Sequence, residues 1–190
     1  MLKTLGEISR DGVRSVCREY LASDMVTLSP REIVYTKKEK LDNCTVKFSF
    51  KDSSENRISK ISASGGNFVD SLYRGCSKKY SKLYPSLSNL VFAGSSIATK
   101  KEKEEVTLKV KELSTKEVIE FRNRSDSFIY SGLVVVLEFF QFYINCEKTF
   151  RRLKYLVLEA QNRQRTDLVS AYSYKMSTLT RLNNYAALEC

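Results

Sequence analysis

Two stretches of this chain follow the same pattern of residues, sixty positions apart and without a gap. One runs from Cys44 to Tyr80 and the other from Glu104 to Phe140. The apolar positions recur in register: Val46, Phe48 and Phe50 as Val106, Leu108 and Val110; Ile58 and Ile61 as Val118 and Phe121; Phe68 and Val69 as Phe128 and Ile129. Because an internal repeat reflects a repeated structural unit, this feature constrains the architecture more than any single residue does.

Each copy predicts an alternating strand, a turn, a second alternating strand, a small polar loop and a helix. In the first copy the expected elements are strands over 45–50 and 57–62 and a helix from 68 to about 80–84. In the second copy they are strands over 90–93, 106–110 and 117–121 and a very apolar helix from 127 to about 145. The predicted fold class is therefore α+β, with two pseudo-symmetric β-β-α repeats.

The segments that flank the repeats predict helices. Residues 9–22 place apolar side chains on one helical face, and two apolar stripes follow Glu147 with a polar break near 162–167. Between these, Ile33 to Tyr35 favour a strand, although Ser29, Pro30 and Glu32 also fit a helical capping box. We expect a helical linker-like segment over 1–30, an α+β domain over 31–145 with repeats at about 31–84 and 88–145, and a helical extension over 146–190.

The apolar helix expected over 127–145 carries apolar residues around most of its circumference. A helix of this kind must be buried on more than one side. A second subunit is the simplest way to bury it, which favours a homodimer.

Composition excludes several kinds of enzyme. The chain of 190 residues contains no histidine. A Ser-His-Asp triad, a Cys-His pair and a histidine zinc site are therefore excluded. No paired-acid constellation, phosphate-binding loop or dinucleotide glycine motif occurs in a suitable context. We expect a protein that is not an enzyme and that holds no metal or cofactor.

The expected compartment is the cytoplasm. The N-terminal residues lack the apolar core of a signal peptide. No apolar run approaches the ~18 residues that a membrane span requires. The five cysteines are odd in number and form no CxxC pair, which predicts free buried thiols.

The formal net charge of +10 leaves a nucleic-acid-binding α+β protein as an alternative. Eleven tyrosines and ten phenylalanines could stack on bases. However, the basic residues alternate with apolar ones, as expected for a strand with one face in solvent. Lys47 and Lys51 flank the segment with Phe48 and Phe50, and Lys109 and Lys111 flank Val110. A scaffold or assembly subunit without a ligand is the third possibility.

The loops that precede the two helices carry a resemblance. The first repeat contains Cys44-Thr45-Val46 and then a loop and helix start over 65–71, and the second contains a helix start over 125–129. These segments resemble the C-terminal regulatory domain of the 2-isopropylmalate synthase and citramalate synthase family, over roughly residues 33–145. That family carries Ala-Thr-Val, Gly-Asn-Gly-Pro-Val-Asp-Ala and, in its second repeat, Ser-x-Asp-Ile.

The match is residue by residue at some positions only. Gly65, Val69 and Asp70 stand in register, Ser71 is a near match, and Ser125 fits the second motif. Phe68 and Asn67 replace the family's proline and second glycine, and Asp126 is displaced by one residue.

The resemblance implies an allosteric domain of the type found in leucine biosynthesis. Such a domain forms a homodimer, binds a branched-chain amino acid such as leucine or isoleucine, and regulates a partner enzyme. The family's catalytic TIM barrel and its His-x-His metal motif have no counterpart in this chain. The resemblance therefore implies regulation and not catalysis.

The helix starts are the expected ligand site. Small residues before a helix present free N–H groups and the positive end of the helix dipole, which suit a carboxylate. Asp70 or Asp126 could bind the ammonium, and Phe68, Ile129 and Phe92 could form the apolar pocket. The candidate ligand residues are Gly65, Gly66, Asn67, Asp70, Ser125 and Asp126. Plain helix capping by the two aspartates, and a tight turn at Gly65-Gly66, remain the alternatives.

Overall fold

The computed structural model describes residues 10–37, 44–100 and 102–180. The chain forms two compact units, one of residues 26–143 and one of residues 1–25 together with 144–190. The ends of the predicted N-terminal segment and C-terminal extension, 1–9 and 181–190, lie outside the described residues.

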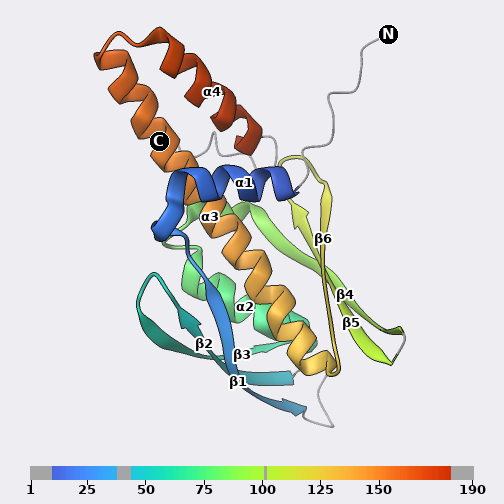
Figure 1. The fold of residues 1–190 in the computed structure, drawn as a ribbon. Coiled ribbons are helices and arrows are strands. Elements are labelled where there is room, and N and C mark those ends of the chain that lie inside the picture. The colour runs from blue at the N-terminus through green and yellow to red at the C-terminus, as the bar shows by residue number, and fades with distance from the viewer. Residues whose placement is uncertain (1–9, 38–43, 101, 181–190) are drawn as a thin grey trace, which may run out of the picture. The chain divides into compact units, whose positions relative to one another are not determined.

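The unit of residues 26–143 contains two three-stranded antiparallel sheets (Figure 1). Sheet A has the order β1-β2-β3 and sheet B the order β4-β5-β6. The strands are β1 (Leu28–Lys37), β2 (Cys44–Asp52), β3 (Arg57–Gly65), β4 (Leu90–Lys100), β5 (Lys103–Glu112) and β6 (Val118–Ser125). Helix α2 (Phe68–Tyr80) follows sheet A, a short 3-10 helix η2 (Pro85–Asn89) leads to sheet B, and α3 (Phe128–Asn162) follows sheet B.

The α+β class and the internal repeat are confirmed. Each repeat contains three strands before its helix, because β1 and β4 pair along nearly their whole length with β2 and β5. The strand expected at 33–35 lies within β1, and the strand expected at 90–93 is the start of β4. The capping-box alternative is wrong, since Ser29, Pro30 and Glu32 lie in β1 and not at a helix start.

The two repeats share hydrogen bonds as well as strands. Ser71 Oγ donates to the carbonyl oxygen of Cys44 at 3.2 Å, and Ser131 Oγ donates to that of Glu104 at 3.0 Å. Both bonds tie the first turn of a helix to the beginning of the central strand. The first strand of each sheet, β1 or β4, also carries a bulge near its start. The sixty-residue repetition in the sequence therefore corresponds to repeated local geometry.

The core of this unit lies where the two repeats meet. The inward side chains of the central strands are at most 3% exposed: Val46, Phe48 and Phe50 in β2, and Val106, Leu108 and Val110 in β5. Phe68 packs edge-on against Phe128 at 5.9 Å between ring centroids, and Tyr80 packs against Phe140 at 6.1 Å. Because equivalent residues meet at both ends, α2 and the first part of α3 run side by side in the same direction. An approximate two-fold axis lies between them.

A buried carboxylate organises the β2–β3 turn and another organises the β5–β6 turn. Asp52 Oδ1 accepts hydrogen bonds from the backbone N–H and hydroxyl of Ser54 at 2.9 and 2.6 Å. Glu112 Oε1 accepts the same two bonds from Ser114. The second oxygen differs: Tyr80 donates to Asp52 Oδ2 at 2.5 Å, whereas the backbone N–H of Thr115 donates to Glu112 Oε2. The two repeats thus place a buried carboxylate at equivalent positions but provide different hydrogen-bond donors for its second oxygen.

Helix α3 differs in length from the expectation. The predicted end near 145 is wrong, because the helix continues without interruption to Asn162. The predicted break is confirmed, since a turn at 163–165 separates α3 from α4 (Thr166–Thr180). The apolar side chains at Leu133, Val136 and Phe140 are at most 1% exposed within the single chain. Their burial therefore requires no second subunit, contrary to the reasoning from the sequence.

Among the described residues, α3 is the one helix that is long and apolar enough to cross a membrane. From the sequence, no segment was expected to be long and apolar enough to span a membrane. Helix α3 meets both criteria because it continues beyond residue 145. Of its most apolar window, 67% is buried inside the protein. The core helix of a protein can have the same length and composition as a membrane span.

The other unit contains α1 (Arg10–Leu21), the 3-10 helix η1 (Ala22–Asp24), the second part of α3 and α4. Helices α1 and α4 meet through an ion pair between Lys175 and Glu19 at 3.1 Å and through Tyr20 and Tyr172. Hydrogen bonding with the thiol of Cys146 lowers the pKa of Cys17. The four described cysteines are free and buried, as the sequence predicts, and Cys190 lies outside the described residues.

The Tyr80–Asp52 bond yields a test of the core. Burial, and next the bond to Asp52, raise the pKa of Tyr80, so its hydroxyl remains a donor. We expect Tyr80→Phe to lower the free energy of unfolding by about 1–3 kcal/mol, because Asp52 Oδ2 loses its donor in a buried site. Urea unfolding followed by circular dichroism measures the change. Tyr130→Phe is the control, since Tyr130 is 50% exposed; an equal loss there would contradict this role of Asp52.

Glu112 predicts a dependence of stability on pH. Burial raises its pKa, but the hydrogen bonds from Ser114 and Thr115 outweigh burial and lower the pKa to about 2. A depressed folded-state pKa stabilises the fold above the unfolded-state value of ~4.3, and this contribution disappears as the pH falls towards 2. We expect Glu112→Gln to destabilise the protein by about 1–3 kcal/mol at pH 7. At pH 2 it should match the parent.

The measurement is the urea midpoint of Glu112→Gln and of its parent at several pH values between 7 and 2. Glu117→Gln is the control, because Glu117 is an exposed carboxylate in the same turn region. A difference between Glu112→Gln and the parent that stays constant over this pH range would contradict the assignment.

Candidate functional site

The predicted site residues lie at the starts of α2 and α3. At α2, Asn67 is the N-cap, and its side-chain oxygen accepts the backbone N–H of Asp70 at 2.9 Å. Asp70 Oδ2 in turn accepts the backbone N–H of Gly66 at 2.9 Å. The two residues therefore form a reciprocal capping arrangement, in which each side chain satisfies a backbone donor at the helix start.

Asp70 is buried and already has partners. It is 4% exposed, and Arg74 Nε donates to its two oxygens at 2.8 and 2.9 Å. Gly65 makes this geometry possible, since a Cβ at that position would lie 2.6 Å from Asp70 Oδ2 and 2.9 Å from the backbone nitrogen of Ser71. Helix capping thus accounts for Gly65, Asn67 and Asp70 without any ligand.

The start of α3 is built differently. Ser125 Oγ donates to the carbonyl oxygen of Ser127 at 2.9 Å and lies 2.8 Å from Ser131 Oγ. Ser127 Oγ accepts the backbone N–H of Tyr130 at a long 3.5 Å. Asp126 is exposed and precedes the helix. The second repeat therefore lacks the buried carboxylate that Asp70 supplies in the first.

The two helix starts lie at the same end of their unit. Phe68, in the first turn of α2, packs on Phe128, in the first turn of α3. Gly132 allows this approach, since a Cβ there would lie 2.5 Å from Phe68. The sequence-predicted residues of the two repeats are thus brought to one region, with both helix dipoles directing their positive ends there.

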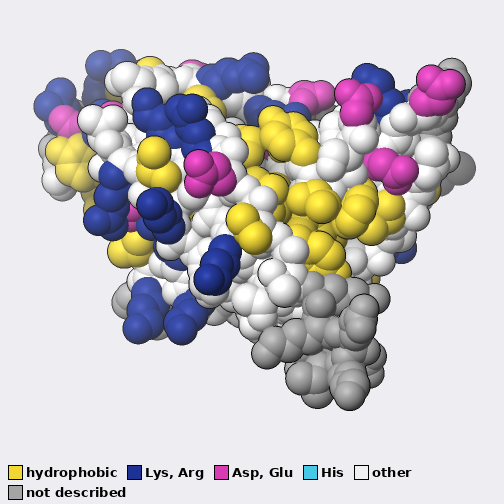
Figure 2. All heavy atoms as spheres, turned by 90° about the horizontal axis from the view of Figure 1, so that it is seen from below, with side chains coloured by type: hydrophobic (Ala, Val, Ile, Leu, Met, Phe, Trp, Pro, Cys, Tyr) yellow, Lys and Arg dark blue, Asp and Glu magenta, His cyan; other side chains and the backbone are white. Residues whose placement is uncertain are grey.

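Figure 2 shows the molecule from below Figure 1, the side on which α3 begins. Hydrophobic side chains gather in the middle of this face, with Lys and Arg side chains to the left. At this end of the unit, Ile97 of β4 and Tyr130 of α3 are each 50% exposed. An exposed apolar surface of this kind is typical of a site that contacts a ligand or another protein.

A groove between α2 and β4 adjoins Asp70. It has a volume of about 480 Å³. Its lining comprises Asp70, Tyr73, Arg74, Ser77 and Lys78 from α2 and Leu87, Ser88, Leu90, Val91 and Phe92 from η2 and β4. We call it the α2–β4 groove. Its volume falls within the range of small-molecule sites.

The α2–β4 groove has an apolar wall and a basic rim. Tyr73 packs against Phe92 at 5.9 Å between ring centroids, and its hydroxyl donates to the carbonyl oxygen of Leu90 at 2.7 Å. Burial raises the pKa of Tyr73. The Arg74 side chain is 65% exposed and Lys78 is exposed, and the hydrogen bond to Asp70 raises the pKa of Arg74. This combination suits a ligand that carries an anionic group and an apolar part.

Some of the residues predicted to contact the ligand line the α2–β4 groove, and others do not. The groove brings together Asp70 and Phe92, which the sequence analysis named for an ammonium and an apolar pocket. Phe68 is instead buried among the rings of Tyr35 and Phe128, and Ile129 is half-buried outside the groove.

Arg74 and Lys78 were missed by the sequence analysis. A signal for Arg74 existed, because an Asp and an Arg four residues apart form an ion pair on a helix. Within the described ranges, no group of three or more Cys, Asp and Glu side chains could hold a metal ion.

No protein-family model matches this sequence, and no curated protein sequence matches it.

Substitution of the two aspartates should affect the stability of the protein to different extents. Asp70→Ala removes a buried acceptor for Gly66 and Arg74, and we expect it to lower the free energy of unfolding by about 1–3 kcal/mol. Asp126→Ala changes an exposed side chain, and we expect a change within about 0.5 kcal/mol. Thermal and urea unfolding of the two variants test the difference. Equal effects would show that Asp70 is not the group that fixes the start of α2.

Proposed function

We propose that this chain is a non-catalytic regulatory domain that binds a small amino-acid effector in the α2–β4 groove. The observation that carries the proposal is the composition of this groove: an apolar wall from Tyr73 and Phe92 beside a basic rim from Arg74 and Lys78. A branched-chain amino acid such as leucine or isoleucine offers the matching groups, a carboxylate and a compact apolar side chain.

Arg74 is the proposed carboxylate-binding residue. Its Nε is engaged by Asp70, which orients the guanidinium along the rim of the groove. The two terminal nitrogens form a planar fork whose geometry matches a carboxylate. Because Asp70 holds the guanidinium before the ligand arrives, less side-chain entropy is lost on binding.

The rest of the ligand meets the other walls. Asp70 also lines the groove, and each carboxylate oxygen can accept more than one hydrogen bond, so it can receive the ammonium. The apolar side chain would lie against Phe92 and Leu90 of the β4 wall. Ser77 and Ser88 supply hydroxyls for the remaining polar contacts.

The resemblance to the 2-isopropylmalate synthase regulatory domain is part of the proposal. It is supported by the presence of two strand-and-helix repeats around an approximate two-fold axis. In this proposal the domain works as a homodimer and passes the binding of the effector on to a partner enzyme. The exposed apolar residues near the helix starts, Ile97 and Tyr130, supply a surface for such contacts.

The cytoplasm is the proposed compartment. The four described cysteines are free thiols, which suits a reducing environment.

The effector is tested by thermal unfolding and calorimetry with each of the twenty amino acids. At a ligand concentration of ~100 times Kd, binding to the folded state alone adds about 2.7 kcal/mol to the free energy of unfolding. We expect leucine or isoleucine to raise the melting temperature. Arg74→Gln should weaken binding about tenfold or more, since a hydrogen bond to a charged group is lost.

Arg163→Gln is the matched control. Arg163 pairs with Glu159 at 2.6 Å and, like Arg74, is an exposed arginine four residues after its carboxylate partner, although it lies in the turn that follows α3. Equal weakening by both variants, or no stabilisation of the parent by any amino acid, would contradict the proposal. Light scattering of the same sample should give twice the mass of the chain, and a monomer would refute the dimer. Stabilisation by oligonucleotides instead, lost at high salt, would favour the nucleic-acid alternative.

A further inference from the structure

The outer face of sheet A carries three lysines around Ser49, whose cross-strand partner on β1 is Glu32. Lys47 and Lys51 lie on β2 on either side of Ser49, and Lys60 is the partner of Ser49 on β3. Because side chains alternate along a strand, these residues point away from the core, where the intervening Phe48 and Phe50 are buried. We call this surface the lysine face.

The lysines of this face have no ion-pair partner among the described residues. The equivalent face of sheet B is different, since Glu120 there pairs with Lys109 at 3.3 Å and with Arg122 at 2.5 Å. Lys60 and Glu120 stand at equivalent positions, sixty residues apart. Sheet B therefore holds its glutamate in ion pairs with two basic side chains, whereas Lys47, Lys51 and Lys60 on sheet A make no ion pair within the described residues.

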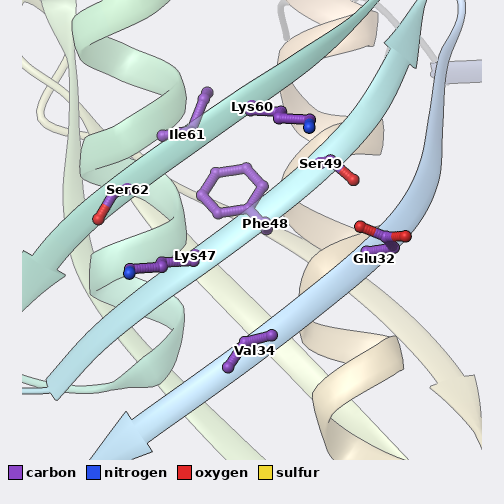
Figure 3. Close-up of a pocket in the computed structure, with 8 residues that line it drawn as sticks. All are labelled: Glu32, Val34, Lys47, Phe48, Ser49, Lys60, Ile61 and Ser62. Carbon is purple, nitrogen blue, oxygen red and sulfur yellow. The ribbon is translucent and has the colours of Figure 1, made fainter.

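The lysine face also contains a hollow of about 300 Å³ (Figure 3). Three strands contribute its lining, which comprises Glu32, Val34, Lys47, Phe48, Ser49, Lys60, Ile61 and Ser62. Val34 is 61% exposed, and Ile58, next to Lys51 in the register, is 55% exposed. Positive charge and exposed apolar groups thus occur on one surface.

We propose that the lysine face binds an extended, acidic segment of a partner protein. In an extended peptide, side chains on one side repeat every ~6.6 Å, as they do along β2. Acidic residues four positions apart therefore match the spacing of Lys47 and Lys51. An apolar residue between them meets Val34 or the hollow, and the hydroxyl of Ser62 lines the same hollow.

The chemistry of the face favours a polypeptide over a nucleic acid. Sheet surfaces that bind single-stranded nucleic acid stack the bases on exposed aromatic rings. Phe48, the aromatic residue of the hollow, is 3% exposed, so its ring is unavailable for stacking. Valine and isoleucine can instead contact the apolar side chains of a peptide. The proposal shares no residue with the α2–β4 groove and does not depend on effector binding.

The test uses a fluorescent peptide in which glutamate, valine and glutamate alternate with serine, so that the acidic residues stand four positions apart. Its binding is measured by fluorescence anisotropy at low and high salt. A second peptide has glutamine in place of glutamate, and a single-stranded DNA oligonucleotide of equal charge provides the nucleic-acid comparison. We expect the acidic peptide to bind, the glutamine peptide to fail, and binding to weaken at high salt, which screens exposed charges.

Two double variants separate the lysine face from the overall charge. Lys47→Glu with Lys60→Glu should weaken binding of the acidic peptide about tenfold or more, because local attraction becomes repulsion. The control is Lys111→Glu with Lys116→Glu, which changes the net charge by the same amount on the sheet B side. We expect it to change the affinity for the acidic peptide by less than about threefold, because these charges act on the peptide only over a long, screened distance. All four lysines are at least partly exposed, and melting curves check that both variants fold.

Three results would overturn the proposal: no binding of the acidic peptide to the parent, equal weakening by both double variants, or tighter binding of the DNA with displacement of the peptide. The last result would assign the face to nucleic acid.

Discussion

The contact between the two repeats is the interaction on which the rest of this unit depends. A three-stranded sheet with one helix covers only part of its own apolar surface, and an isolated unit of that size buries too little to be stable. Here Phe68 meets Phe128, Tyr80 meets Phe140, and Tyr73 contacts both Phe139 and Phe140. The helices therefore bury each other's apolar faces, and each sheet closes one side of a shared core.

The same contact positions the candidate site. Because α2 is held between its own sheet and the second repeat, its outward edge faces β4 and forms the α2–β4 groove. Tyr73 belongs both to the core and to the groove. Its ring packs against Phe140 in the aromatic core, and its hydroxyl donates a hydrogen bond to the carbonyl oxygen of Leu90 at the groove. A small shift of α2 against β4 would thus change the groove and the core together.

Much of the fold could be predicted from the sequence because each repeat expresses its structure locally. The alternation of Val46, Phe48 and Phe50 identifies β2, and its recurrence at Val106, Leu108 and Val110 identifies β5. The continuation of α3 beyond 145 was missed, since the polar residues after Cys146 resemble a boundary although Glu147 and Thr149 are fully buried. Burial of such residues depends on tertiary packing, which a sequence pattern does not express.

The candidate site was less predictable than the fold. Asp70 was found because acidic residues at helix starts have a short-range signature, and the capping alternative raised for it fits the bond that it makes to Gly66. Asn67 was named only as a ligand residue, and it is the N-cap of α2. The α2–β4 groove was not found, because the pattern of apolar residues does not show how α2 packs against η2 and β4, which follow it in the chain. The lysine face was also missed, since lysines that alternate with apolar residues look alike in sequence whether or not a cross-strand glutamate faces them, as Glu120 faces Lys109.

The approximate two-fold axis between α2 and α3 has a consequence for the origin of the chain. A half-length protein with one copy of the repeat would carry the same self-complementary helix face, and two such chains would associate around a true two-fold axis. In that ancestor every substitution would appear twice. Joining the copies in one chain removes this restriction, so that position 80 can hold a tyrosine while position 140 holds a phenylalanine. Duplication followed by fusion would produce one architecture that carries two chemically different halves.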